Sequence, residues 1–341
     1  MSILMIGTRR SGSNLTRLML DQLPGVEAPQ PAHILQKFMP LLPNYGDLSK
    51  PSTFRLLVDD VCQLVELNPV PWEGVTLNAD DIISRCTQRS LVAIFSSIYD
   101  VLAETRGAKM WCCKSVENVY YLPEIHAYLP NARYLHLYRD GRDVAVSFRK
   151  AIIGEKHFYH IAQEWAQAQR AALKMSRRLG ESQFFGLSYE KLTGQPEDTL
   201  QTLCAFLGVD YDPSMLDFHK SDAAKSTASS SSLWCNLAQP VMNQNSQKFL
   251  TQASAEDVKI FELVAGDALD MLGYERTQTS PGDSANFTAE EVARFNAQNQ
   301  QLKAQAQETK TSNDQGSRVQ QDALLKMIQE RSSSSTSTLL A

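Results

Sequence analysis

The chain begins with Ser2-Ile3-Leu4-Met5-Ile6, continues as Gly7-Thr8-Arg9-Arg10-Ser11-Gly12-Ser13-Asn14, and then reads Leu15-Thr16-Arg17-Leu18-Met19-Leu20. The first run has the length of a buried strand, and the apolar residues of the last recur at helical spacing. Gly7 and Gly12 have the G-x-x-x-x-G spacing of a phosphate-binding loop. Glycines let backbone N–H groups turn toward an anion, and a helix N-terminus adds positive potential. The stretch therefore predicts an anion-binding strand–loop–helix unit, with an ordinary glycine-rich turn as the alternative.

This loop differs from a Walker loop in the position of its cation. A Walker loop has Lys after the second glycine. Here Ser13 and Asn14 follow Gly12, and the cation Arg10 lies inside the loop. Together with Ser11, these short polar side chains can donate hydrogen bonds to a phosphate or sulfate. The difference points away from ordinary nucleoside triphosphates.

Length and composition exclude several classes of protein. At 341 residues, the chain can hold one large domain or two modest ones. A net charge of −5 gives no overall basic field, which argues against a nucleic-acid partner. No secretory signal pattern and no apolar run of membrane-spanning length is present, so we expect a cytoplasmic protein without membrane contact. The six cysteines are scattered, as in proteins of a reducing compartment.

Strand-like and helix-like segments alternate along the first 275 residues. Apolar strand patterns occur at 110–113, 133–138 and 184–188, and a turn with a very short strand is expected within 24–29. Helical patterns occur at 30–35, 119–128, 158–179, 196–207 and 255–272, with a further helix that begins near 139–143. This alternation predicts an α/β fold, in which helices flank a P-loop-like parallel sheet.

Three segments interrupt or follow this pattern. Residues 36–108 are predicted to form a mostly helical insertion that shapes an acceptor pocket. Residues 221–232 are rich in Ser, Ala and Lys and are predicted to form a flexible loop. We assign 1–275 to one domain and 276–341 to a polar, low-complexity tail, partly helical or disordered. The tail is expected to pack little against the domain, and it could carry a homo-oligomer contact.

Several motifs in order resemble the sulfotransferase superfamily that uses 3′-phosphoadenosine 5′-phosphosulfate (PAPS), in its bacterial and tyrosylprotein-sulfotransferase-like branch. The loop at 7–15 resembles the family's 5′-phosphosulfate loop, and Tyr138-Arg139-Asp140-Gly141-Arg142-Asp143-Val144-Ala145-Val146-Ser147 resembles its 3′-phosphate motif. Further similar stretches are Lys114-Ser115-Val116, Ser188-Tyr189-Glu190-Lys191-Leu192, Pro240-Val241 and Lys248-Phe249. The resemblance covers roughly residues 1–275. It implies a parallel sheet with the nucleotide at the carboxyl ends of the strands.

The resemblance also implies the residues that bind the nucleotide. Arg139 and Ser147 would hold the 3′-phosphate, and Tyr189 would lie near the adenine. The remaining candidates are Arg9, Arg10, Ser11, Gly12, Ser13, Asn14 and Lys248. The alternative for Arg139 is an ion pair with Asp140 or Asp143, and that for Tyr189 is a place in the core. Arg142 is expected to pair with an aspartate.

Sulfuryl transfer places negative charge on the bridging oxygen of the leaving group, so it needs cations there and a base at the acceptor. Arg10 and Lys114 are the predicted cations. Many relatives have a Glu after the second short strand, whereas this chain has Gln30 there, which cannot take a proton. His33 is the predicted base, and Glu27 is the alternative.

These residues predict an enzyme that moves a sulfuryl group from PAPS to a hydroxyl or an amine nitrogen of a small molecule. This chemistry requires no metal, and His157 and His160 are interpreted as a solvated helix face. The alternatives are a P-loop kinase, disfavoured by the missing G-K-[ST], and a non-catalytic nucleotide-binding relative, suggested by Gln30.

Overall fold

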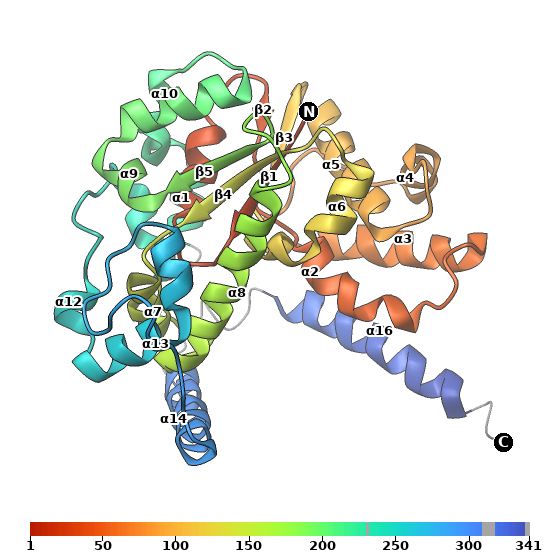
Figure 1. Cartoon of the computed structure of the whole chain (residues 1–341). Helices are drawn as coiled ribbons and strands as arrows, with labels where there is room; N and C mark the ends of the chain where they lie inside the picture. The colour runs from red at the N-terminus through yellow and green to blue at the C-terminus, as the bar shows by residue number, and fades with distance from the viewer. Residues whose placement is uncertain (230–231, 309–317, 338–341) are drawn as a thin grey trace.

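A five-stranded sheet lies at the centre of the computed structural model, which describes residues 1–229, 232–308 and 318–337 (Figure 1). The strands are β1 (Ser2–Gly7), β2 (Val26–Glu27), β3 (Met110–Cys113), β4 (Arg133–Tyr138) and β5 (Phe184–Ser188). Their order is β2-β3-β1-β4-β5, and every neighbouring pair is parallel. The predicted α/β class is therefore confirmed.

Alternate residues of β1 enter two different hydrophobic cores because successive side chains of a strand point to opposite faces. Ile3 and Met5 pack into the core beneath α1 (Ser13–Leu20), α9 (Tyr189–Gly194), α10 (Pro196–Leu207) and η3 (Pro213–Lys220). Leu4 and Ile6 pack into the other core, formed with α2 (Ile34–Phe38), α3 (Pro51–Glu66), α5 (Leu91–Thr105), η2 (Val116–Tyr121) and α6 (Leu122–Tyr128). Both faces of the sheet are thus covered, which is typical of parallel sheets.

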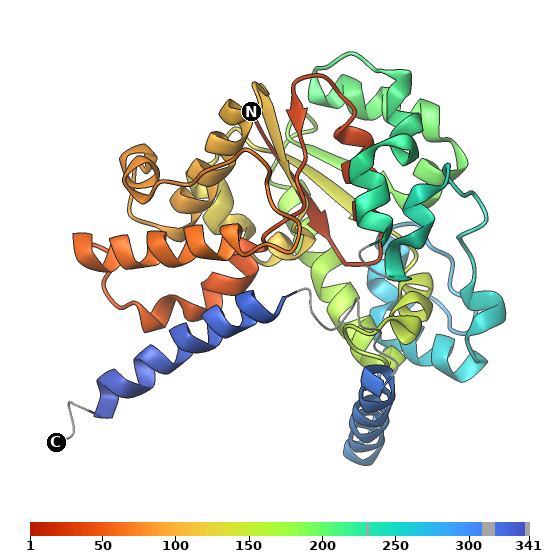
Figure 2. The ribbon, with the colours of Figure 1, turned by 180° about the vertical axis from the view of Figure 1, so that it is seen from behind.

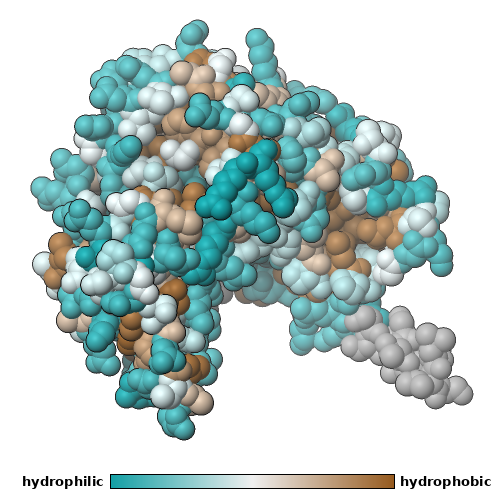
Figure 3. Space-filling model, viewed as in Figure 1, coloured by the Kyte–Doolittle hydropathy of each residue, from teal (hydrophilic) through white to brown (hydrophobic). Residues whose placement is uncertain are grey.

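The helical insertion and a third core complete the main body. The insertion contains η1 (Met39–Asn44), α3, α4 (Ala79–Arg85) and α5. The third core holds α7 (Gly141–Lys150), α8 (Phe158–Ser176), α12 (Phe249–Gln252) and α13 (Ala255–Met271). Hydrophilic residues dominate the face shown in Figure 3, with smaller hydrophobic areas between them. In the described part of the chain, no helix is long and apolar enough to cross a membrane.

The prediction of a flexible loop at 221–232 is wrong for most of that segment. Residues Asp222–Ser229 form α11, and η4 begins at Ser232, while residues 230–231 lie outside the described part. Ser221 caps the first turn, because its hydroxyl accepts from the Ala224 amide at 3.1 Å. Ala224 and Thr227, three residues apart, are buried on one face. The Ser-rich composition concealed this short i, i+3 pattern.

The tail packs more closely than its composition predicted. It contains α14 (Ala289–Glu308) and α16 (Val319–Ser337), while 309–317 and 338–341 lie outside the described part. The two helices project as separate arms from the lower side of the molecule in both views (Figures 1 and 2). Phe295 of α14 is buried, and Leu324 and Ile328 of α16 join the core of the insertion. Polar contacts add to this packing, since Asn299 of α14 accepts from the Lys156 and His157 amides and Arg331 of α16 forms an ion pair with Asp60. The domain boundary at residue 275 stays a prediction.

We expect Ile328→Ala to lower the free energy of unfolding by about 2 kcal/mol or more, as other buried Ile→Ala changes do. Ile328 is 1% exposed, whereas its neighbour Met327 is 43% exposed. Met327→Ala is therefore the matched control and should change stability little. Chemical denaturation measures both variants. Equal stabilities of the two would show that docking of α16 contributes nothing to the fold.

Candidate active site

The loop between β1 and α1 requires glycine at both ends. Gly7 has a φ of +137°, and a Cβ there would lie 2.2 Å from the Leu137 carbonyl oxygen. Gly12 has a φ of +90°, and a Cβ there would lie 2.6 Å from Cδ2 of Tyr189. Arg10 adopts a φ of +70° without being glycine. Such a conformation costs free energy and is concentrated at functional sites.

The first turn of α1 has amide groups available for an anion. Gly12 precedes the helix, and no side chain caps it. The neighbouring hydroxyls of Thr8 and Ser11 lie 3.0 Å apart and bond to each other. N–H groups at a helix N-terminus lack partners within the helix and carry partial positive charge. This end of α1, which starts with Ser13, therefore suits a phosphate or sulfate.

Arg139, Arg10 and Ser147 are linked by hydrogen bonds and so bring the two predicted phosphate motifs together. We call these three residues the phosphate cradle. The Arg139 Nη1 donates to the Arg10 carbonyl at 3.2 Å, and the Arg10 Nε donates to the Ser147 hydroxyl at 2.9 Å. The Arg139 guanidinium also lies 4.4 Å from the centre of the Tyr189 ring. The ion pair weighed as an alternative is present as well, because Nη2 lies 3.7 Å from Asp143. The Arg139 Nε is buried without a hydrogen-bond partner in the described part, which leaves one donor for a ligand.

The two arginines make this cradle strongly positive. Burial lowers the pKa of Arg10, and the charge of Arg139 lowers it further. An anion bound between them would offset both effects, since it restores favourable charge pairing to partly desolvated cations.

The segment before α12 closes over this cradle. The Asn245 carbonyl accepts from Arg139, and its Nδ2 donates to the Tyr189 hydroxyl at 2.7 Å. The Phe249 amide donates to Asp143 at 3.0 Å. Lys248, predicted to bind the nucleotide, precedes Phe249 and is partly buried. Sequence reasoning missed Asn245, because no motif marked it apart from its nearness to Lys248.

Lys114 reaches the same loop from the neighbouring strand. It follows β3, and its Nζ donates to Oδ1 of Asn14 at 2.6 Å. Burial lowers the pKa of Lys114 to about 7, and the nearby Arg17 adds to that effect. An ammonium with this pKa can both donate a proton and stabilise negative charge at neutral pH.

His33 lies near Lys114, at the start of α2. Its φ of +58° places it in the left-handed region, and its Nδ1 is buried without a partner in the described part. Burial and the charge of Lys114 hold the pKa of His33 well below 6.5, so the imidazole is neutral at neutral pH. Glu27 has a pKa raised by burial, and its interacting charges are Asp21, Arg106 and Arg17. Of the two candidate bases, only His33 therefore has Lys114, a predicted catalytic cation, among its interacting charges.

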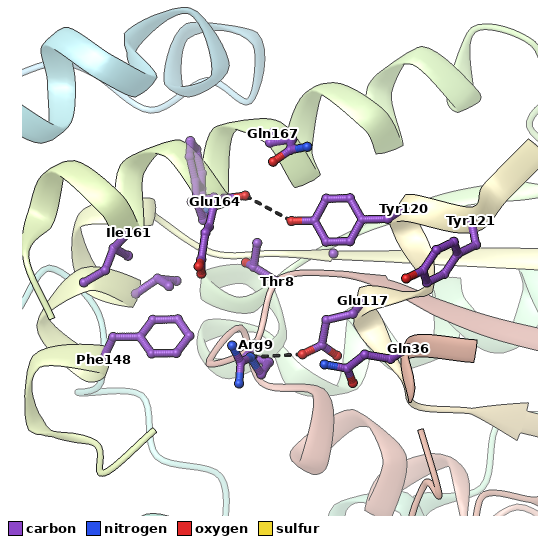
Figure 4. A pocket seen from close by; sticks show the side chains of 13 residues that line it. Thr8, Arg9, Gln36, Glu117, Tyr120, Tyr121, Phe148, Ile161, Glu164 and Gln167 are labelled. Carbon is purple, nitrogen blue, oxygen red and sulfur yellow. Dashed lines mark hydrogen bonds and ion pairs between the residues drawn. The ribbon is translucent and has the colours of Figure 1, made fainter. Parts of the chain in front are cut away.

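A cavity of about 390 Å³ opens beside the loop, on the side of α2 and α8 (Figure 4). Arg9 lies at one wall, where its Nε forms an ion pair of 3.0 Å with Glu117 and its guanidinium faces the Phe148 ring. Glu164 projects from α8 across the cavity, and burial raises its pKa. Lining residues include Gly7, Thr8, Gln36, Tyr120, Tyr121 and Trp165. The predicted nucleotide ligand Arg9 thus faces this cavity.

Two further predictions concern residues outside the cradle. Arg142 pairs with Asp140 at 2.7 Å and with Glu262 at 2.6 Å, as expected for a structural arginine. His157 caps α8 through its Nδ1 and stacks on Phe295 at 4.7 Å, so it is not a solvated side chain. Among the described residues, no group of three or more His, Cys, Asp or Glu side chains could hold a metal.

The sequence profile of the sulfotransferase family matches residues 2–213, which include the loop, Lys114 and the Arg139–Ser147 motif. The chain belongs to the sulfotransferase family. Protein-tyrosine sulfotransferase A of Caenorhabditis elegans is 25% identical over 62% of this chain and 50% of its own length. An uncharacterised protein of Aquifex aeolicus is 25% identical over 67% of this chain and 28% of its own. The chain therefore spans half or less of the length of these relatives.

Solved sulfotransferase domains share the fold. The domain from the Synechococcus PCC 7002 olefin synthase has a TM-score of 0.51 and 19% identity, and covers 77% of this chain and 93% of its own. The domain from the curacin biosynthetic pathway has a TM-score of 0.55 and 19% identity. The match covers 81% of this chain and 98% of that domain. These likenesses agree with the parallel sheet described above.

Gln30, which stands where the resemblance led us to expect a glutamate, contacts α11. The Gln30 Nε2 donates to the Thr227 hydroxyl at 3.0 Å, and the buried Arg17 donates to the same oxygen at 3.1 Å. The Gln30 backbone carbonyl accepts from the Trp72 indole at 2.7 Å. Both the side chain and the backbone of Gln30 are therefore held by hydrogen bonds. Thr227 escaped prediction because its segment was assigned to a loop.

Proposed function

We propose that this sulfotransferase transfers a sulfuryl group from PAPS to a hydroxyl or an amine nitrogen of a small-molecule acceptor. One observation carries the proposal: the contacts Arg139–Arg10 and Arg10–Ser147 unite two separate anion sites next to the uncapped end of α1. A nucleotide with phosphate groups at both its 3′ and 5′ positions needs such a pair of sites. A nucleoside triphosphate needs only one, in agreement with the missing Walker lysine.

The residues of the cradle divide between the two ends of the nucleotide. In the proposal, Arg139 and Ser147 bind the 3′-phosphate, to which the unpartnered Nε of Arg139 would donate a charge-assisted hydrogen bond. Tyr189 lies against Gly12 and supports the adenine. The remaining ligands at the phosphosulfate end are Arg9, Arg10, Ser11, Gly12, Ser13 and Asn14, with Lys248 at the rim.

Catalysis is assigned to three side chains with different tasks. Arg10 stabilises charge on the leaving phosphate before and during transfer. Lys114 donates to the bridging oxygen as that oxygen gains charge, which is where a cation contributes most. His33 takes the proton of the acceptor, and its neutral state at neutral pH suits a base. No step in this scheme requires a metal ion.

The cavity beside the loop supports a small acceptor. Its volume of about 390 Å³ lies within the range of small-molecule sites, and aromatic side chains line part of it. Because Gly7, Thr8 and Arg9 form one wall, a molecule bound there adjoins the loop that would hold the sulfuryl donor. By its name, the relative from Caenorhabditis elegans acts on tyrosine in proteins.

Arg139→Ala should weaken binding of adenosine 3′,5′-bisphosphate by about 1.5–3 kcal/mol, the usual range for hydrogen bonds to a charged group. Affinity for adenosine 5′-phosphosulfate should hardly change, because that nucleotide lacks the 3′-phosphate. Calorimetry measures both nucleotides, with Arg170→Ala as the control, since Arg170 is exposed and pairs with Asp267. Equal losses for the two nucleotides would contradict the assignment of Arg139.

A further inference from the structure

A buried glutamine of α16 is held in a fixed orientation beside α2, the helix that the predicted base His33 precedes. Gln321 of α16 is 0% exposed, and its Nε2 donates to the Leu64 carbonyl at 2.8 Å. Because an amide nitrogen only donates and its oxygen only accepts, this bond fixes which atom points away from α3. The Gln321 Oε1 therefore faces α2.

Two cations converge on that one neutral oxygen. Lys37 of α2 donates to Oε1 at 3.1 Å, and Arg318, just before α16, donates to it at 2.7 Å. Among the described residues, neither cation forms an ion pair with a carboxylate. Asp322, which is exposed, offsets their charge only in part. Burial lowers the pKa of Lys37 to about 8, and Arg318 adds to the effect.

Like charges at such a shared oxygen repel each other, and partial burial reduces the screening by water. Lys37 and Arg318 therefore carry more positive charge than the carboxylate near them offsets. An oxyanion could accept hydrogen bonds from both cations, and charge-assisted bonds of this kind are among the strong ones in proteins. The described structure thus has the donors for an anion at this place.

The cation pair lies close to the proposed chemistry. Lys37 is one helical turn after His33, because its amide donates to the His33 carbonyl at 3.0 Å. The charge of Arg318 also contributes to the lowered pKa of both His33 and Lys114. A group bound by Lys37 would therefore be held from the helix that His33 precedes.

We propose that Lys37 and Arg318 bind an oxyanion of the acceptor, a carboxylate or a phosphate, so that the C-terminal helix completes the acceptor site. The inference rests on the proposed sulfuryl transfer and specifies its acceptor as an anionic molecule. The bound anion would also strengthen His33 as a base, because it offsets two of the charges that hold its pKa down. The tail thus has a role in substrate recognition as well as in packing.

Binding of the anion is tested first without any transfer reaction. The protein is saturated with adenosine 3′,5′-bisphosphate, which fills the cradle, and inorganic phosphate is then titrated by calorimetry. We expect Lys37→Gln and Arg318→Gln each to weaken phosphate binding about tenfold or more. The charge-retaining Lys37→Arg should preserve it. Lys326→Gln is the matched control, because Lys326 is an exposed lysine of α16, the helix that Arg318 precedes.

The melting temperature of each variant shows whether α16 is still docked, and a variant that melts as the wild type does gives a valid comparison. Unchanged phosphate affinity in both glutamine variants would overturn the proposed anion site. So would equal weakening by Lys326→Gln, since that result would indicate only a general effect of charge.

A second measurement identifies the source of the anion. Transfer is compared for matched acceptors that differ only as a free carboxylate and its methyl ester. The wild type should show a lower KM for the acid, and Lys37→Gln should lose that preference while its affinity for the bisphosphate nucleotide is unchanged. Equal use of acid and ester by the wild type would overturn the assignment to the acceptor. Complete absence of transfer, with phosphate binding still dependent on Lys37, would refute the proposed function while leaving the anion site in place.

Discussion

His33→Ala is expected to cut turnover about a hundredfold or more while affinity for the nucleotide stays at the wild-type value. A general base contributes about 10²–10⁴ to the rate. The His33 Nδ1 has no hydrogen-bond partner in the described part, and His33 is not among the residues assigned to the nucleotide. The loss should therefore fall on the chemical step. Steady-state kinetics and calorimetry separate the two quantities.

The pH dependence gives the same prediction an independent readout. A base must be deprotonated, so the rate of the wild type should fall as the pH drops through the pKa of His33. That pKa is held well below 6.5 by burial and by Lys114, so the acidic limb should lie well below pH 6.5. The limb should be absent in His33→Ala. Glu27→Gln is the control and should keep its activity. Full turnover in His33→Ala together with loss in Glu27→Gln would assign the base to Glu27.

Lys114→Ala should lower turnover about 10²–10³-fold and weaken nucleotide binding much less. The interaction of Lys114 grows as the bridging oxygen becomes negative, so most of its effect belongs to the transition state. The Asn14 Oδ1, which accepts a hydrogen bond from Lys114, would lose a partner, but Asn14 is only partly buried. Turnover under saturating nucleotide, compared with affinity from calorimetry, measures this difference.

The pKa of about 7 predicts a second limb for Lys114. If its protonated form acts, kcat/KM should fall as the pH rises through about 7, because the free enzyme then loses the ammonium proton. Lys114→Arg should remove that limb, since a guanidinium remains charged throughout the range. A basic limb at the same pH in Lys114→Arg would assign the titration to another group. Loss of nucleotide affinity equal to the loss of turnover in Lys114→Ala would assign Lys114 to ground-state binding.

Local patterns predicted the sheet and the loop well, because their signals are contained in short stretches. The apolar runs of β1, β3, β4 and β5 coincide with observed strands. The glycine spacing marked the loop, where both φ angles and close contacts with Leu137 and Tyr189 require glycine. The ends of parallel strands meet at one edge, so Lys114 and Arg139 could be expected near the loop from topology alone.

The long-range contacts could not be read from the sequence. Asn245, Thr227 and Gln321 act through hydrogen bonds to residues far away in the chain, and a polar residue in a polar segment carries no periodic signal. The docking of α16 rests on Leu324 and Ile328, which are too few to distinguish a packed helix from a solvated one by composition. The tail was therefore expected to pack little. For the same reason, the sequence did not indicate that Arg318 and Gln321 of the tail contact Lys37.

The proposed function is tested most directly by following the sulfuryl group itself. The protein is incubated with PAPS labelled in that group and with a set of hydroxyl and amine acceptors, and products are separated and identified by mass. We predict that the label moves to an acceptor oxygen or nitrogen, with release of one adenosine 3′,5′-bisphosphate for each group transferred, and that the γ-phosphate of ATP is not transferred. Transfer from ATP instead, or tight binding of the bisphosphate without transfer to any acceptor, would contradict the account.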